Sequence, residues 1–167
     1  MALVELPHTS GCVVCGHDNP FGLHLRLFVD EQTGIVTCPF EPAARHIGFE
    51  GIVHGGVIAT VLDEAMVWAA TWAGKRFCVC GELNVRFRES VILGGPLQVE
   101  AKVIAHRSRL ITTEGTLADD QSRVLVSASG KYVPVSSERN VNVVSTLVTE
   151  PATSQTMQVL KQAAGLG

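Results

Sequence analysis

Two kinds of apolar spacing divide the first half of the chain. Residues 23–30 (LHLRLFVD) alternate apolar and polar side chains, which predicts a half-buried strand. Residues 31–34 predict a turn, and residues 35–40 predict a second strand. Residues 41–53 contain Pro42, Gly48 and Gly51 and predict a loop. Residues 57–73 are apolar on almost every side, so this segment is expected to form one long, buried helix.

Four further strand-like runs follow Gly74. They cover residues 78–88, 97–106, 111–118 and 123–133, with short polar or glycine-containing separators between them. Short connections between consecutive strands favour an antiparallel meander. From residue 136 the composition shifts to Ser, Thr, Val and Gln. We therefore expect one domain over residues 1–135 and a loosely ordered tail over 136–167, with a short helix at 154–164.

The order of these elements is two strands, one buried helix and four strands. A helix that is apolar on most sides needs a sheet to cover it, and strands on both sides of it in the sequence allow the sheet to curl around it. The prediction is an α+β hotdog fold, with an antiparallel sheet of about six strands wrapped around one long central helix. The sequence contains no internal repeat.

Composition limits which binding partners and which cellular compartment are expected for this protein. The formal net charge of the 167 residues is −3 and aromatic residues make up only 5%, so neither a nucleic acid nor a membrane surface is expected as a partner. Residues 57–73 are near the lower length limit for a membrane span and carry two central acids, so we do not expect this segment to cross a membrane. Residues 1–11 lack the pattern of a signal peptide. Five cysteines at irregular spacing favour a reducing, cytoplasmic environment over a disulfide framework.

The start of the predicted helix is the first candidate functional feature. His54-Gly55-Gly56 stands immediately before the long apolar run. Glycines let the backbone approach a ligand closely, and the first turn of a helix leaves N–H groups without intrahelical acceptors. Those donors and the positive end of the helix dipole suit a developing oxyanion. A purely structural role, a tight turn from loop to helix, is the alternative.

Two adjacent acids, Asp63 and Glu64, interrupt the apolar run. Burying a carboxylate is costly, and neighbouring residues on a helix point about 100° apart, so the two acids are expected to have different roles. One of them could face a reaction site while the other pairs with a basic residue or a backbone donor. Alternatively, one or both form a buried ion pair with Arg86, Arg88 or a similar residue.

Helix geometry sets a limit on how these groups can cooperate. Gly56 and Asp63 are seven residues apart, which is about 10 Å along a helix axis. A carboxylate and an oxyanion donor that serve one carbonyl must both lie about 3 Å from the reacting atoms. One straight helix cannot readily supply both, so two copies of the chain are predicted to share each site at a dimer interface.

Cysteine and tryptophan residues offer other candidate chemistry. Cys12-x2-Cys15 with His17 is suggestive of zinc, but a closed structural site needs four ligands, and Cys38 and His24 complete it poorly. We therefore expect an ordered turn and no metal. Trp68 and Trp72 lie four residues apart on the predicted helix and are expected in the core or lining a pocket.

Several motifs together carry a family resemblance. His54-Gly55-Gly56-x6-Asp63, within HGGVIATVLDEAM, is joined by LNVRF at residues 83–87, by GGPL at 94–97, and by CVVCG and NPFGL at 12–16 and 19–23. Over residues 10–135 this combination resembles the PaaI-type hotdog-fold acyl-CoA thioesterases.

The resemblance implies roles for the residues at the helix start. Asp63 would be the general base for water, or the nucleophile, at the thioester carbonyl. The Gly55 N–H would polarise that carbonyl, and His54 would orient the thioester or support the loop. Because other hotdog branches place a glutamate on this helix, Glu64 could share the role; the register with His54 favours Asp63.

The resemblance also implies a set of substrate-binding residues, namely Gly56, Asn84, Cys80 and Gly81. Cys80 stands where some relatives have a Ser or Thr that holds the hydrolytic water, and cysteine is a weaker hydrogen-bond partner. Gly48 stands where some relatives have Asn or Gln.

The implied activity is hydrolysis of an acyl-CoA to a carboxylic acid and free CoA, without a cofactor. A non-catalytic acyl-CoA binding protein and a hotdog 3-hydroxyacyl thioester dehydratase are the alternatives. The expected assembly is a homodimer with interface active sites, which pairs further into a homotetramer.

Overall fold

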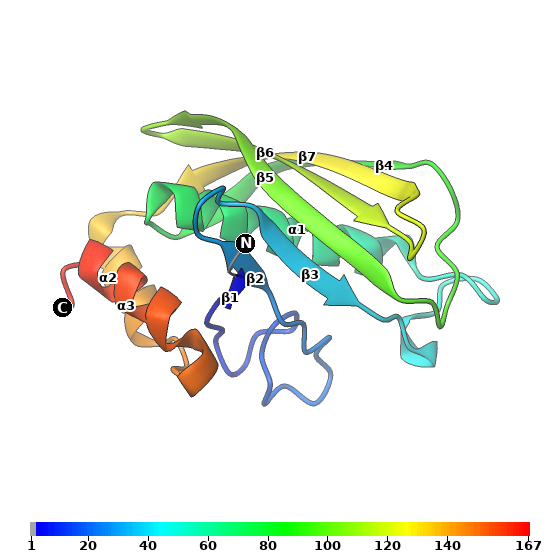
Figure 1. Ribbon diagram of the computed structural model, residues 1–167, viewed down its shortest axis with the longest axis horizontal. Coiled ribbons are helices and arrows are strands. Elements are labelled where there is room, and N and C mark those ends of the chain that lie inside the picture. The colour runs from blue at the N-terminus through cyan, green and yellow to red at the C-terminus, as the bar shows by residue number, and fades with distance from the viewer. Residues whose placement is uncertain (1–2) are drawn as a thin grey trace.

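One long helix packed against one antiparallel sheet forms the centre of the molecule (Figure 1). The computed structural model describes residues 3–167. Helix α1 spans Gly55–Gly74, and the sheet has the order β1-β2-β3-β5-β6-β7-β4, with every neighbouring pair antiparallel. The strands are β1 (Leu3–Glu5), β2 (Phe28–Asp30), β3 (Val36–Phe40), β4 (Cys78–Phe87), β5 (Leu97–Arg107), β6 (Leu110–Ala118) and β7 (Val124–Pro134). The predicted hotdog fold is confirmed.

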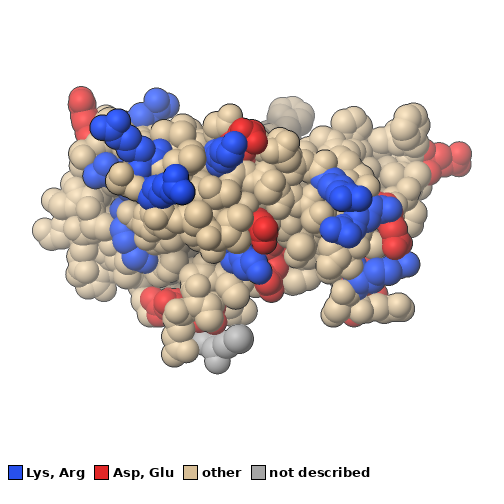
Figure 2. Space-filling model, turned by 90° about the horizontal axis from the view of Figure 1, so that it is seen from above, with Lys and Arg blue, Asp and Glu red and all other residues tan. Residues whose placement is uncertain are grey.

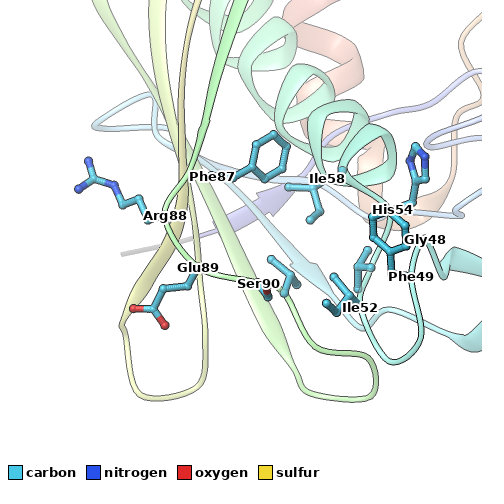
Figure 3. Close-up of a pocket in the computed structure, with 12 residues that line it drawn as sticks. Gly48, Phe49, Ile52, His54, Ile58, Phe87, Arg88, Glu89 and Ser90 are labelled. Carbon is cyan, nitrogen blue, oxygen red and sulfur yellow. The ribbon is translucent and has the colours of Figure 1, made fainter.

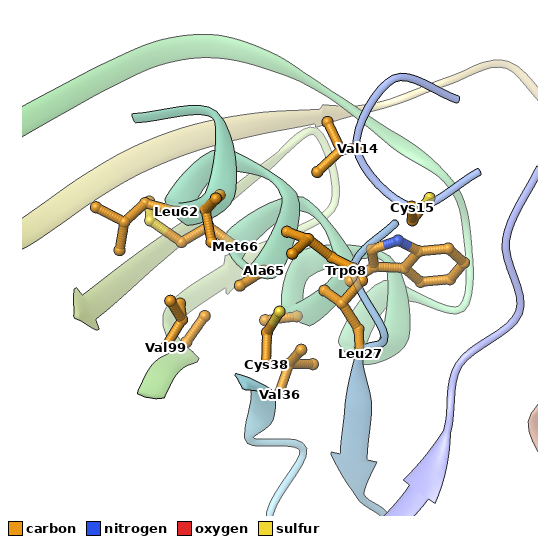
Figure 4. Packing of buried hydrophobic residues seen from close by; sticks show 14 of the residues in the cluster. Val14, Cys15, Leu27, Val36, Cys38, Leu62, Ala65, Met66, Trp68 and Val99 are labelled. Atoms are coloured by element: carbon orange, nitrogen blue, oxygen red, sulfur yellow. The ribbon is translucent and has the colours of Figure 1, made fainter. Parts of the chain in front are cut away.

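Helix α1 contains the predicted segment, residues 57–73, and extends it by two residues at its start and by one at its end. The His54 side chain caps its first turn, and Lys75 ends it in a left-handed conformation at φ 51°. Its buried side chains include Ile58, Leu62 and Met66, which pack with strand residues such as Val36 and Val99 (Figure 4). None of the helices in residues 3–167 is long and apolar enough to cross a membrane.

The sheet differs from the prediction in strand number and order. It has seven strands instead of about six, because the three-residue strand β1 adds to the edge beside β2. Strands β5, β6 and β7 form the predicted meander, but β4 pairs with β7 and not with β5. The chain leaves α1 at the far edge of the sheet and returns through residues 88–96. As a result, β4 is an edge strand of ten residues.

The predicted strand over residues 23–30 forms a ladder only at its end. The alternation correctly marks Leu25, Leu27 and Val29 as buried. However, His24 adopts a positive φ of 53°, which interrupts the extended backbone, and only Phe28–Asp30 is strand. Leu23 and Leu25 instead donate backbone hydrogen bonds to the loop carbonyls of Val13 and Val14.

The C-terminal tail is more ordered than the sequence suggests. It forms α2 (Ser137–Ser145), which was not predicted, a short 3-10 turn η2 (Pro151–Thr153), and α3 (Ser154–Ala163), which was. Val144, Met157 and Leu160 are buried. The Thr156 hydroxyl donates to the Glu5 carbonyl at 2.6 Å, so the tail is fastened to β1. A few apolar residues at helical spacing pack the tail against the rest of the molecule. The mostly polar composition of the tail did not indicate this packing.

Candidate active site

The junction before α1 presents one free backbone donor. The Gly56 N–H donates to Nδ1 of His54 at 2.9 Å, and the N–H groups of Val57 and Ile58 donate to the His54 carbonyl. Among the hydrogen bonds of residues 3–167, none uses the Gly55 N–H. His54 is therefore a helix cap, with its Nδ1 occupied, and Gly55 is the donor that remains for a ligand.

The loop before this junction packs closely on His54. A Cβ on Gly48 would lie 2.9 Å from the His54 Cα, so the loop approaches the helix start only because residue 48 has no side chain. The His54 N–H donates to the His46 carbonyl at 2.8 Å. Where some relatives carry an Asn or Gln side chain, this chain therefore has a close backbone contact. Glu50 is exposed on the same loop and, among the described residues, forms no hydrogen bond to the junction.

An apolar cavity of about 660 Å³ opens beside Gly55 (Figure 3). Its walls come from the loop, from the first turn of α1 and from the end of β4. Phe87 and Ile58 point into the space between helix and sheet, whereas Arg88 and Glu89 project outward. A Cβ on Gly55 would lie 3.3 Å from Cζ of Phe87, so the ring packs close to Gly55.

A second cavity, of about 680 Å³, lies on the other side of His54. Residues of the N-terminal loop, including Val13 and Phe21, face Gly56 and Val57 of α1 across it. His46 also lines it; burial, and then the neighbouring Arg45, lower the pKa of His46. Its Nδ1 accepts from the Ala43 N–H, and its buried Nε2 has no partner among the described residues. The helix start thus lies between two cavities.

Asp63 belongs to a polar cluster between α1 and the sheet. The hydroxyl of Tyr132, a fully buried residue of β7, donates to Oδ1 of Asp63 at 2.7 Å. Cys80 of β4 is the cross-strand neighbour of Tyr132, and burial followed by the Asp63 carboxylate raises the pKa of its thiol. Burial and the same carboxylate also raise the pKa of Tyr132. Tyr132 was not predicted, because a lone tyrosine in a strand-like run gives no signal of the partner it reaches.

Glu64 faces a different side of α1. Trp68 Nε1 donates to its Oε1 at 3.1 Å, and Cys15 of the N-terminal loop lies beside it. Burial raises the pKa of Glu64 to about 7. The two acids therefore have separate surroundings, as predicted, and neither forms an ion pair with Arg86 or Arg88 among the described residues.

Two of the predicted substrate-binding residues lie apart from this cluster. Leu83 and Val85 of β4 pack towards the core, so the exposed Asn84 between them points to the opposite face, where it donates to Glu82. Gly81 lies at a β-bulge between Cys80 and Glu82. The bulge shifts the alternation of β4, so that Cys80 can face Asp63.

The surface of the sheet that faces away from α1 carries mixed charge. Viewed from above, Lys and Arg side chains lie in small groups interspersed with Asp and Glu, and most of this face is uncharged (Figure 2). The groups described above lie around α1, which is the candidate site. Gly55 lies near the Phe87 end of β4, and Asp63 lies near the Cys80 end.

Comparison with protein families agrees with this architecture. The family model described as the thioesterase superfamily matches residues 50–126. The matched segment contains the helix start, both acids, and β4 to β6. The recognition made from the sequence motifs is confirmed at this level.

Individual relatives match part of the chain. A protein of Saccharolobus solfataricus, named as a candidate esterase, is 32% identical over 84 residues, which cover 50% of this chain and 55% of the relative. Overall, the chain spans about half the length of the curated relatives that it matches.

Three solved structures share the fold. A thioesterase superfamily protein has a TM-score of 0.69 at 28% identity, covering 74% of this chain and 60% of its own. PaaI of E. coli, from the phenylacetic acid degradation operon, has a TM-score of 0.62 at 16% identity, with coverage of 68% and 81%. A Streptococcus mutans protein bound to acetyl-CoA has a TM-score of 0.59 at 17% identity, with coverage of 62% and 82%. At these identities the last two show the fold alone.

Proposed function

We propose that the protein is an acyl-CoA thioesterase that releases a carboxylic acid and free CoA. The observation that carries this proposal is the pair formed by a free Gly55 N–H at a helix start and an Asp63 carboxylate held by Tyr132. The superfamily of residues 50–126 supports the reaction type, and the fold shared with a protein bound to acetyl-CoA supports the ligand class.

In this mechanism Asp63 accepts a proton from water. The water oxygen attacks the thioester carbonyl carbon, and the carbonyl oxygen becomes an oxyanion that accepts a hydrogen bond from the Gly55 N–H. The intermediate collapses by breaking the carbon–sulfur bond, and the thiolate of CoA leaves and takes up the proton that Asp63 had accepted, which restores the carboxylate. Tyr132 occupies one carboxylate oxygen of Asp63 and fixes its orientation, so the other oxygen remains for water.

The site requires two copies of the chain. Gly55 and Asp63 are eight residues apart on one helix, about 12 Å along its axis. Gly55 lies at the Phe87 end of β4, and Asp63 lies at the Cys80 end. If two β4 edges pair antiparallel about a two-fold axis, the Phe87 end of one strand meets the Cys80 end of the other. Gly55 then faces Asp63 of the partner subunit.

The exposed edge of β4 supports this assembly. A long unpaired edge strand is a ready template for pairing with another chain, and β4 exposes Val79 and Phe87. Pairing two such strands joins the sheets of two subunits into one. Sedimentation velocity would measure whether the assembly stops at a dimer or continues to the expected tetramer.

The two cavities divide the substrate between them. The apolar cavity beneath Phe87 receives the acyl group, which is aryl or medium-chain aliphatic, because Phe49, Ile52 and Ile58 line it. The cavity beside Arg45 receives the CoA arm, since a guanidinium at its rim can bind a phosphate.

The first test measures thiol release from a panel of acyl-CoAs. Wild type is compared with Asp63→Asn and with Glu64→Gln, two isosteric changes at adjacent positions. Loss of activity confined to Asp63→Asn supports the mechanism. Loss confined to Glu64→Gln assigns the base to the neighbouring residue, and CoA-ester binding without turnover by wild type favours a non-catalytic binding protein instead.

The role of the Gly55 N–H as an oxyanion donor is tested with a matched pair of variants. Gly55→Pro removes the N–H at the first helical position, where proline is tolerated, and Gly55→Ala adds a Cβ but keeps the donor. We expect a loss of about 10²–10³ in kcat that is specific to Gly55→Pro, the usual cost of removing one oxyanion donor.

Mixing two inactive variants tests whether sites are shared. An Asp63→Asn chain and a Gly55→Pro chain, refolded together, form mixed dimers in which one shared site carries both changes and the other carries neither. With random pairing, activity should recover to about a quarter of the wild-type value. No recovery would mean that each site lies within one chain.

A further inference from the structure

A second group of reactive side chains lies outside the proposed site, between the N-terminal loop and α1. Cys12 and Cys15 come from the loop, and Glu64 comes from a side of α1 that points about 100° away from Asp63. The two sulfur atoms and a carboxylate oxygen all lie within 4.8 Å of one another. Figure 4 shows Cys15 beside Trp68, against the helix.

The loop is built to hold these two thiols together. The Gly16 N–H donates to the Cys12 carbonyl at 3.0 Å, and the Val14 N–H donates to the Cys12 sulfur at 3.4 Å. A Cβ on Gly16 would lie within 2.5 Å of backbone atoms of Ser10 and Cys12, so the turn admits only glycine at this position. The spacing of the thiols is therefore fixed by the backbone.

The carboxyl group of this cluster has no basic partner among the described residues. Glu64 is largely buried, and none of the salt bridges in residues 3–167 involves it. Two thiols and a carboxylate are ligands that a soft or borderline divalent cation prefers.

We propose that Cys12, Cys15 and Glu64 bind a thiophilic divalent cation of the zinc class. A tetrahedral zinc with sulfur ligands at about 2.3 Å places those sulfurs about 3.8 Å apart, so the cluster needs only small side-chain shifts to close on the ion. Water takes the fourth position. Binding displaces the thiol protons and any proton on Glu64.

The ion would act on the second cavity. The loop that carries the two cysteines also supplies Val13 and Phe21 to the wall of that cavity, whereas Glu64 belongs to α1 on the other side. A metal that joins loop and helix fixes the width of the cavity. This consequence holds whether or not the protein hydrolyses a thioester.

Another candidate, the group formed by His8, His17 and Glu150, is the weaker one. The centroids of the two imidazole rings lie 3.9 Å apart with an interplanar angle of 30°, so the rings pack against each other at a tilt. His17 already lies 3.6 Å from the Glu150 carboxylate. This group serves as the internal control for the proposed site.

Cobalt is the probe for the test, because Co²⁺ bound by thiolates gives charge-transfer and tetrahedral ligand-field bands. Reduced, chelator-treated protein is titrated with Co²⁺ and then with Zn²⁺, which should displace it. We expect one equivalent with thiolate bands in wild type, loss of the bands in Cys12→Ser, and altered ligand-field bands in Glu64→Gln. Circular dichroism checks that Cys12→Ser, at a partly exposed position, remains folded.

Two matched controls make the outcome decisive. Cys80→Ser removes an exposed thiol elsewhere, and His17→Ala removes a ligand of the competing group. Both should bind Co²⁺ as wild type does. The proposal is overturned if wild type gives no thiolate band, if Cys12→Ser or Glu64→Gln binds as wild type, or if either control loses the bands.

Discussion

Replacing Glu64 by glutamine should change how stability depends on pH. Burial raises the pKa of Glu64 from 4.5 to about 7 in the folded protein. The folded state therefore binds this proton more tightly than the unfolded state does. Its contribution to the free energy of unfolding is complete below about pH 4.5 and is lost as the pH rises through 7.

The size of the effect follows from the shift. A displacement of about 2.5 pKa units, at about 1.4 kcal/mol per unit, corresponds to about 3 kcal/mol. Glu64→Gln keeps an oxygen acceptor for Trp68 Nε1 but cannot ionise. Relative to wild type, the variant should therefore gain about 3 kcal/mol of unfolding free energy between about pH 4.5 and pH 8.

Urea unfolding of chelator-treated protein at a series of pH values measures this difference. Taking wild type minus variant cancels the other titrating groups, among them His8 and His46. Glu50→Gln, a change at an exposed glutamate, is the control and should track wild type at each pH. A difference between wild type and Glu64→Gln that does not vary with pH would refute the argument that burial controls this carboxylate.

Three further predictions concern other parts of the site. Tyr132→Phe removes a hydrogen bond to a charged group, which should lower the unfolding free energy by about 1.5–3 kcal/mol in urea titrations. It should also lower kcat more than KM in the thiol-release assay; unchanged kcat would exclude a positioning role. Gly48→Ala should cost about 1–3 kcal/mol, because its Cβ meets the backbone of the capping histidine, whereas Gly95→Ala, which meets nothing within 4 Å, should be near neutral in thermal unfolding. Iodoacetamide at about pH 6.5 should label Cys12 before Cys80, because their pKa values are shifted in opposite directions; equal labelling by mass spectrometry would contradict those shifts.

Much of the fold could be predicted from residue pattern. The position of α1 to within two residues, the meander of β5 to β7 and the burial of Leu25, Leu27 and Val29 follow from apolar spacing. The strand order could not be predicted in this way, because the pairing of β4 with β7 depends on the edge of the sheet at which α1 ends. The packed tail did not follow either, because its few apolar residues acquire partners only in three dimensions.

The candidate site was predictable in part. Helix geometry indicated that Asp63 and Glu64 point in different directions, and the two acids have different hydrogen-bond partners. The role of the Gly55 N–H as a donor, which the family resemblance implies, stays a prediction. Tyr132 was missed, since it reaches Asp63 across 69 residues of sequence. The third member of the thiol cluster was missed for the same reason, because a motif search looks near Cys12 and Cys15 and not on a distant helix.

The contact between the first strand and the last helix bears on the order of folding. The hydrogen bond from Thr156 to Glu5 joins residues 151 positions apart, so β1 can find its final partner only after nearly all of the chain has left the ribosome. Contacts of such sequence separation carry a large loop-closure entropy and form late. We therefore expect α1 and the meander to assemble first during synthesis, while β1 and the loop that follows it dock at the end. The wall of the second cavity would then be the last part of the molecule to become competent for a ligand.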